Sequence, residues 1–208
     1  VALGNDLRQP SASGRIRYAT DSPSSLYLRS TTLEDFSGRR WAPDLREDTR
    51  RRGLQDMSPA EESARAGELS QVTTRVMSET YASPWLLAPY APQSVSGAVG
   101  SYSWDPANMT VISGGAAERG TLDYEVQSLA PNLSPADLQG LAPAPRDAVG
   151  PIFTSLPENL PASIRGAAAA ATEGATGPYE QAMAIQSYLR GSAFSYSLDA
   201  PVEGGYDG

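Results

Sequence analysis

A two-residue alternation of apolar and polar side chains is the feature of this sequence that most limits its fold. It is cleanest in the stretch TLDYEVQSL, where Leu122, Tyr124 and Val126 fall on one side and polar residues on the other. One-sided alternation is typical of an antiparallel sheet with one face in water. Weaker examples recur upstream, and together they predict a sheet or sandwich of roughly five to eight strands. The other candidate strands are residues 15–20, 26–36, 71–77 and 109–113.

Two stretches of the first 130 residues do not read as central strands. Residues 83–100 contain Pro84, Pro89 and Pro92, and proline cannot donate to a sheet ladder. This stretch is predicted to be an extended connection whose apolar residues pack against the sheet, namely Trp85, Leu86, Leu87 and Tyr90. Residues 44–70 are polar, and an exposed loop is favoured there over a short helix beginning at Ser58.

Helical patterns begin only after Leu129. Ser134, Pro135 and Asp137 have the N-cap, N1 and N3 identities of a short helix. A second helix is predicted over Pro161–Thr172, and a third from Pro178 to Gly191. The third helix carries an apolar stripe that we expect to be buried, formed by Tyr179, Ala182, Met183, Ile185 and Leu189. Alternation at Phe194, Tyr196 and Leu198 predicts a short strand after it.

These patterns predict an α+β fold in which an antiparallel β-sheet or β-sandwich domain is followed by a helical segment. We place the β-rich accessory domain at residues 1–135 and the helical segment at residues 136–208. No stretch approaches the roughly 18 apolar residues that would span a bilayer.

Composition excludes several classes of function. The net charge of −8 argues against a nucleic-acid surface, which needs clustered positive charge. The sequence contains no Cys and no His, which excludes a thiol nucleophile and a Ser–His–Asp triad. Twenty-four acidic residues leave a carboxylate-pair glycosidase possible in principle, although no two of them are paired by pattern in an apolar pocket. We therefore predict no catalytic, cofactor-binding or metal-binding residue.

Aromatic residues raise a second class of function. Trp41, Trp85 and Trp104, with ten tyrosines, could line a face that binds a cell-envelope polymer or a protein partner. Each tryptophan lies beside a proline or a turn, a placement that suits rings closing the ends of a sheet. Core packing is the favoured interpretation, and an independent β-sandwich binding module is the alternative.

Three further patterns favour ordinary structural interpretations over functional ones. Asp199, Glu203 and Asp207 could offer oxygen ligands to calcium, but their spacing is not that of a known loop. The run Arg50–Arg52 lies beside acidic residues and reads as a solvated loop. The glycosylation sequon at Asn132 ends in Ser134, which is better explained as a helix cap.

Three stretches resemble the TgpA type of bacterial transglutaminase-like membrane protein. The first is YLRSTTLEDFSGRRWAP, which contains the pattern of Phe36, Gly38 and Trp41 after a strand. The second is RGTLDYEVQSLAPNLSPADL, a strand followed by a capped helix. The third, GPYEQAMAIQSYLRGSAFSYSLDAPVEGGYDG, resembles the segment that leads into the active-site cysteine of that family.

This resemblance implies a membrane-anchored parent protein with a papain-like thiol core on the outer face of the cytoplasmic membrane. Tyr179–Arg190 matches the helix upstream of the nucleophile helix, and Phe194–Pro201 matches the strand and loop after it. No catalytic residue can be carried over, so we expect a truncated, non-catalytic scaffold. The parent is expected to act on peptide or glutamine-type amides as a protease, amidase or acyltransferase. The expected partners are its own core and membrane anchor, and a peptide or cell-envelope substrate, but no nucleic acid.

Overall fold

The structure is a computed structural model that describes residues 15–38, 41–43, 51–58, 69–81, 83–97, 100–113, 120–145 and 147–195. The chain divides into two compact units, which we call the sheet unit and the helical unit. The sheet unit comprises Ser11–Thr32 and Leu45–Leu133, and the helical unit comprises Val1–Pro10, Leu33–Asp44 and Ser134–Gly208. The predicted α+β class, with antiparallel sheets and then helices, is confirmed.

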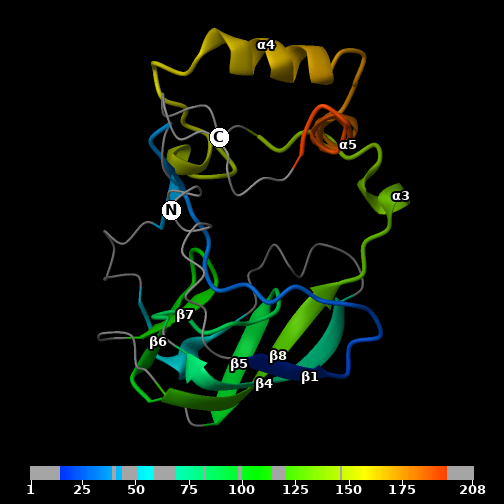
Figure 1. Cartoon of the computed structure of the whole chain (residues 1–208). Coiled ribbons are helices and arrows are strands. Elements are labelled where there is room, and N and C mark those ends of the chain that lie inside the picture. Colours follow the sequence, from blue (N-terminus) through cyan, green and yellow to red (C-terminus); the bar gives the residue numbers. More distant parts are fainter. Residues whose placement is uncertain are drawn as a thin grey trace. The chain divides into compact units, whose positions relative to one another are not determined.

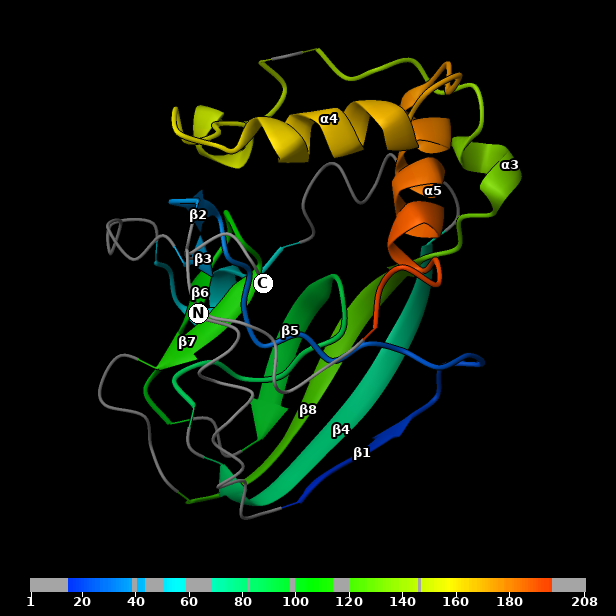
Figure 2. The same cartoon turned by 45° about the horizontal axis from the view of Figure 1, so that its top comes forward.

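A four-stranded antiparallel sheet forms the main layer of the sheet unit (Figure 1). Its two longest strands lie side by side in the middle of the sheet, where Figure 2 labels them β4 (teal) and β8 (yellow-green). In spatial order the strands are β1 (Ile16–Thr20), β4 (Leu69–Tyr81), β8 (Gly120–Pro131) and β5 (Pro92–Gly97).

The register of β4 and β8 explains which face of the sheet is buried. Val76 is the partner of Tyr124, and Thr74 is the partner of Val126, so the alternating apolar sets of both strands lie on one face. All four of these side chains are buried. The opposite face carries the ion pair between Arg75 and Asp123, both of them exposed. The one-sided alternation predicted from the sequence is therefore confirmed.

The core of the sheet unit continues into a two-stranded hairpin. Strand β6 (Tyr102–Asp105) pairs with β7 (Thr110–Ser113), and Trp104 in β6 is only 1% exposed. A short 3-10 helix, η2 (Leu54–Asp56), contributes Leu54 to the edge of this core. The buried cluster comprises Val76, Tyr81, Leu86, Ala88, Tyr102, Trp104, Val111, Leu122, Tyr124 and Val126.

Residues 26–36 do not form the long strand that their composition predicts. Arg29 makes an isolated antiparallel bridge to Ala88, and only Asp35–Phe36 forms a strand, β2. The stretch therefore pairs at two separate short places, Arg29 with Ala88 and β2 with β3 (Trp41–Ala42), and does not join the four-stranded sheet. Conversely, Pro92 begins a real strand in the proline-containing stretch, but β5 lies at the sheet edge, as proline requires.

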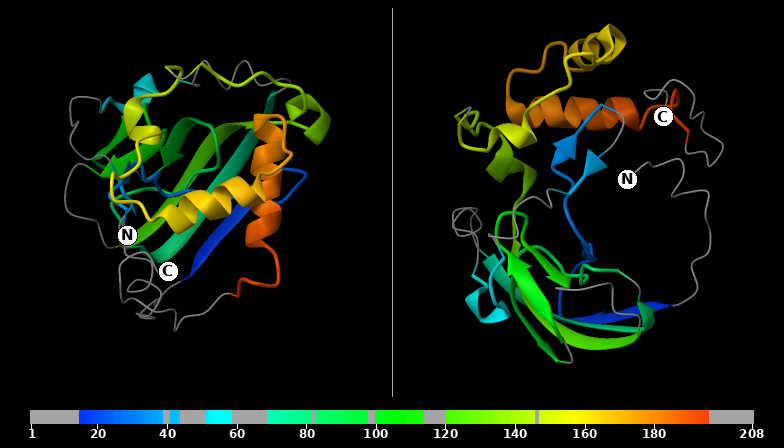
Figure 3. Two further views of the ribbon diagram at one scale, coloured as in Figure 1. Left: turned by 90° about the horizontal axis from the view of Figure 1, so that it is seen from above. Right: turned by 90° about the vertical axis from the view of Figure 1, so that its left-hand side faces the viewer.

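Within its described residues, the helical unit contains short strands and three α-helices. Strand β2 pairs with β3 (Trp41–Ala42), and the Phe36 and Trp41 rings stack with their centroids 4.5 Å apart. Helices α4 and α5 run in different directions (Figure 3), and they contact each other. The helices are α3 (Pro135–Leu138), the 3-10 helix η3 (Pro151–Phe153), α4 (Ala162–Ala171) and α5 (Pro178–Leu189).

The predicted helix signals are confirmed, but the predicted burial is wrong. Ser134 and Asp137 form a reciprocal capping box at α3, and α5 begins at Pro178 as expected. No residue of α5 is buried, and Ile185 and Leu189 are 39% and 55% exposed. The stripe lies along one helix face as its spacing dictates, but no described element of its own unit covers it.

Some predictions are not realised or fall outside the described residues. Phe194 is not in a strand, and the rest of that predicted strand is not described. The possible helix after Ser58 and the acidic residues Asp199, Glu203 and Asp207 also lie outside the described residues. Within the described ranges, every helix is too short or too polar to cross a membrane.

Candidate functional site

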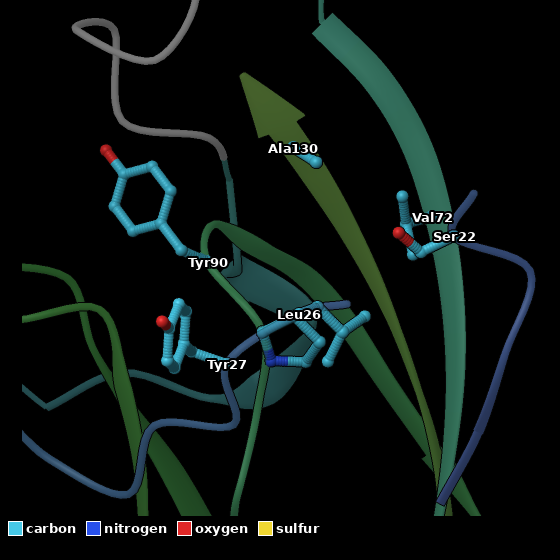
Figure 4. Close-up of a pocket in the computed structure, with 7 residues that line it drawn as sticks. Ser22, Leu26, Tyr27, Val72, Tyr90 and Ala130 are labelled. Atoms are coloured by element: carbon cyan, nitrogen blue, oxygen red, sulfur yellow. The ribbon is translucent and has the colours of Figure 1, made fainter. Parts of the chain in front are cut away.

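The candidate site lies where two extended segments of the sheet unit run antiparallel. Backbone N–H groups of Arg29 and Ala88 each donate to the carbonyl of the other residue, both at 3.0 Å. Because side chains alternate along extended backbone, residues two positions from this bridge share its face. Tyr27 and Tyr90 occupy those positions opposite one another. Figure 4 shows the two rings near each other on one side of a pocket.

The pocket beside these rings has a volume of about 150 Å³ and a mainly apolar wall. Leu26 faces away from its neighbour Tyr27, because adjacent extended residues point to opposite sides, and it lines the pocket (Figure 4). Val72 of β4 and Ala130 of β8 supply the wall on the sheet side. The described residues that line the pocket are Ser22, Leu26, Tyr27, Val72, Pro89, Tyr90 and Ala130.

Arg29 holds Tyr90 from the side. Its guanidinium carbon lies 5.6 Å from the centroid of the Tyr90 ring, which is a cation–π distance. One terminal nitrogen of Arg29 also donates to the carbonyls of Asn108 and Met109, at 3.2 and 2.8 Å. Burial is the largest influence on the pKa of Arg29 and lowers it from its ordinary value. This cation is thus committed to contacts within the protein.

Hydrogen bonds to the sheet fix the segment that carries Tyr90. The hydroxyl of Tyr124 accepts from the Leu87 N–H at 3.0 Å and donates to the Leu87 carbonyl at 2.9 Å. Ser128 Oγ donates to the Pro89 carbonyl at 3.3 Å. Ala91 and Leu129 exchange both backbone hydrogen bonds, at 2.9 and 3.0 Å. The segment is therefore held on both sides of Tyr90 and is a rigid support for the ring.

Burial of Tyr124 and Tyr81 changes the pKa values of their phenols. Burial is the largest influence on the pKa of its phenol and raises it, and the Leu87 contact opposes that change only in part. Burial raises the pKa of Tyr81 in the same way, and the hydroxyl of Tyr81 donates to the Trp85 carbonyl at 2.5 Å. Both phenols are thus neutral structural donors near pH 7.

The three tryptophans have different environments. Trp104 is buried in the core, which confirms the favoured interpretation for that residue. Trp85 is half-buried, and Trp41 is 48% exposed and stacked on Phe36. The expectation that Tyr90 is packed away against the sheet is wrong, because its ring is 40% exposed on the rim of the pocket.

Asn108 and Arg52 have structural roles in the described chain. Asn108 is buried, and its side-chain carbonyl accepts from the Thr110 hydroxyl at 2.6 Å. Arg52, part of the predicted solvated loop, exchanges backbone hydrogen bonds with Trp104, both at 2.8 Å, although its side chain is exposed. No group of three or more acidic side chains is close enough to hold a metal ion in the described parts of the chain. The carboxylate-pair alternative stays a prediction.

Sequence reasoning missed Tyr27 and Tyr90 as a pair. They are 63 positions apart, and only the bridge between Arg29 and Ala88 brings them opposite one another. The available signal was weak: Tyr90 is an aromatic residue in a segment interrupted by prolines, where it cannot continue a buried strand.

The fold and the site together define an antiparallel β domain with a rigid aromatic rim, joined in one chain to a helical unit. The chain belongs to the TgpA N-terminal domain family, whose model matches residues 1–135. No curated protein matches the sequence.

Solved structures extend the likeness beyond residue 135. The crystal structure of the periplasmic domain of TgpA from Pseudomonas aeruginosa is similar, with a TM-score of 0.60 and 18% identity. That match covers 98% of this chain but only 64% of the solved chain. The same domain bound to ethylmercury gives a TM-score of 0.60 and 16% identity, over 99% of this chain and 66% of that one. At this level of identity the likeness shows a shared fold.

Proposed function

We propose that this chain is a non-catalytic, extracytoplasmic scaffold that positions the thiol core of a transglutaminase-like membrane protein. Membership of the TgpA N-terminal domain family and the likeness to a periplasmic domain support this role and location. The parent protein would use the core for thioester chemistry on peptide or glutamine-type amides. The absence of Cys and His from these 208 residues supports assigning that chemistry to a separate part of the parent.

The observation that carries the proposal is the uncovered apolar stripe on α5. Ala182, Ile185 and Leu189 recur at the i, i+3, i+7 spacing of one helix face, with Tyr179 beside them, yet α5 has no buried residue. A sequence selected for a solvent-exposed helix does not keep such a stripe, because each large apolar side chain gains about 1.5–3 kcal/mol on full burial. A packed partner explains the stripe, and the thiol core is the partner that the family supplies.

A binding titration tests this proposal directly. The 208-residue chain is titrated with the separately expressed thiol core of the parent protein, and the dissociation constant is measured by calorimetry. Ile185→Glu places a charge in the stripe and is expected to weaken binding at least about tenfold. Ser187→Glu adds the same charge on another side of α5 and is the matched control. Equal losses in the two variants, or no binding by the unmodified chain, would refute docking through this stripe.

The non-catalytic assignment has its own test. The isolated chain is assayed for hydrolysis and for amine transfer on a glutamine-containing peptide. We expect no turnover above the uncatalysed background. Turnover that increases in proportion to the chain concentration and is retained after repurification would overturn the assignment.

A second candidate function is recognition of an envelope component or protein partner by the sheet unit. The observation that favours it is the rim of the pocket, where Tyr27 is 94% exposed and Tyr90 is 40% exposed beside it. Two exposed aromatic rings over an apolar cavity resemble the centre of a recognition surface more than the border of a core. Replacing Tyr27 is expected to remove this binding without changing the affinity for the thiol core.

A further inference from the structure

We propose that the pocket beside Tyr27 and Tyr90 binds one uncharged apolar side chain of an extended polypeptide. This inference specifies the ligand of the second candidate function and does not depend on the scaffold role. Three properties of the pocket lead to it: its size, the chemistry of its wall, and the position of its two aromatic rings.

Size limits the ligand to a single group. Pockets that enclose a whole drug-sized ligand usually have volumes of about 300–1,000 Å³. The cavity here has about 150 Å³, which is the size of an apolar cavity that accepts one benzene ring. An aliphatic or aromatic side chain fits this volume, whereas a complete cofactor or an oligosaccharide does not. The remainder of the ligand must therefore lie outside the pocket.

The wall favours a hydrocarbon group over a sugar. Leu26, Val72, Pro89 and Ala130 provide carbon surface, and none of the described residues that line the pocket has a charged or amide side chain. Each sugar hydroxyl buried there without a partner would cost about 1–3 kcal/mol. A leucine or phenylalanine side chain loses no hydrogen bond on entry. The wall thus selects against carbohydrate, even though exposed tyrosines by themselves could stack on a sugar ring.

The charges of this chain limit which polymer could supply the bound side chain. Arg29, the cation next to the rim, already donates to two backbone carbonyls and lies beside the Tyr90 ring. It acts as a positioning residue for Tyr90. The chain as a whole carries a net charge of −8, which repels anionic polymers and lipid surfaces. A neutral or basic polypeptide is the compatible partner.

The two rings supply the rim that a docked segment needs. Tyr27 is 94% exposed, so its ring has almost no contact area committed within the protein. Tyrosine gives a large contact area for little conformational entropy, and the held backbone of the Tyr90 segment lowers that cost further. Tyr90 is thus a fixed wall, and Tyr27 can close over the entering side chain.

The test uses the 208-residue chain and neutral pentapeptides of the form Gly-Gly-X-Gly-Gly, with both ends blocked. Binding is followed by NMR shift changes at the residues that line the pocket. Peptides with X as leucine or phenylalanine are expected to bind with affinities of about 1 mM, about tenfold or more tighter than the alanine peptide. A neutral oligomer of N-acetylglucosamine is tested in parallel as the carbohydrate probe.

Two variants and one control locate the binding. Tyr27→Ala is expected to weaken the leucine peptide about fivefold to tenfold, because one aromatic contact is lost. Ala130→Leu fills the pocket and is expected to abolish the preference for leucine over alanine. Tyr18→Ala removes a tyrosine of β1 that is 47% exposed but does not line the pocket, and is expected to change nothing.

Each contrary result overturns the proposal. Leucine and alanine peptides of equal affinity would show that the pocket admits no side chain. An unchanged affinity after Tyr27→Ala would place binding elsewhere, and this exposed residue can be replaced without endangering the fold. Saturable binding of the sugar oligomer at the pocket, with silent peptides, would show a carbohydrate site. None of these outcomes affects the scaffold role, which is tested by affinity for the thiol core.

Discussion

The most demanding prediction concerns the hydroxyl of Tyr124, which satisfies both backbone groups of Leu87. Tyr124→Phe removes one oxygen and leaves the Leu87 N–H and carbonyl without this partner. The ring itself stays, so the packing of the core is conserved. Each neutral hydrogen bond contributes about 0.5–1.5 kcal/mol net, and two are lost. We expect the free energy of unfolding to fall by about 2 kcal/mol.

The expected loss of stability for Tyr124→Phe can be compared with the losses for the same substitution at two other tyrosines. Tyr81 donates one hydrogen bond, to the Trp85 carbonyl, so Tyr81→Phe is expected to cost about 1 kcal/mol. Tyr18 is about half exposed in the edge strand β1, and Tyr18→Phe is expected to have no measurable effect. The order of the three losses depends on the number of backbone groups that lose their partner, two for Tyr124, one for Tyr81 and none for Tyr18. The Ser83 hydroxyl, which also bonds to Tyr81, is only half-buried and can bond to water instead. This order is therefore a sharper test than any single magnitude.

Urea denaturation followed by far-UV circular dichroism measures these differences. With a slope of about 2 kcal/mol/M, a loss of 2 kcal/mol lowers the urea midpoint by about 1 M. The slope should be the same in all variants, because the exposed area on unfolding is unchanged. If Tyr124→Phe shifts the midpoint no more than Tyr81→Phe at equal slopes, the argument that its two contacts stabilise the segment is refuted.

Three shorter predictions concern residues of the sheet unit, the second of them with a control in the helical unit. Burial raises the folded-state pKa of Tyr124 above the unfolded value of about 10. The stabilisation from its neutral phenol is therefore present below pH about 10 and is lost as the pH rises further. In urea denaturation at a series of pH values, Tyr124→Phe should reduce this alkaline loss by up to about 1.4 kcal/mol per pH unit. Gly97 has a φ of 113°, and an added Cβ would lie 2.8 Å from the Asp123 carbonyl oxygen, so Gly97→Ala should lower the free energy of unfolding by more than about 1 kcal/mol. Gly140 has a φ of 79° but no atom within 4 Å of the added Cβ, so Gly140→Ala should cost less. Equal losses would contradict the argument that the close contact at Gly97 matters. The hydrogen bonds from Arg75 hold the pKa of Asp123 below its usual range, so Arg75→Gln should move the NMR titration midpoint of Asp123 upward, and an unchanged midpoint would show that the pair does not form in solution.

Local patterns predicted the parts of the fold that depend on local physics. The alternation around Tyr124 identified β8 and its buried face because a strand has only two faces and one of them must be apolar. The capping box of Ser134 and Asp137 identified α3 because both hydrogen bonds are made within four residues. Residues 83–100 were predicted only as an extended connection, so the strand β5 was missed, although its place at the sheet edge fits Pro92, which cannot donate to a second neighbour.

Features that depend on distant partners could not be predicted in this way. Residues 26–36 have the composition of one long strand, but only Arg29, which bridges to Ala88, and Asp35–Phe36, which pair with β3, find extended partners. The opposition of Tyr27 and Tyr90 depends on that same long-range bridge, so the candidate pocket had no local signature. The stripe on α5 was correctly located by its spacing, but spacing indicates only that a face is suited to burial and not whether this chain buries it.

The two units differ in what holds each of them together, and this difference bears on both proposals. The sheet unit contains a contiguous core around Trp104 and Tyr124, so its pocket is carried by a frame that does not need another component. Helices α4 and α5 contain no buried residue, so their packing leaves the stabilisation of that unit to whatever covers the stripe. Recognition at Tyr27 should therefore survive when the helical unit is perturbed, whereas docking of the thiol core should order that unit. Ile185→Glu separates these effects, because it is expected to abolish the ordering by the core and leave the leucine peptide bound.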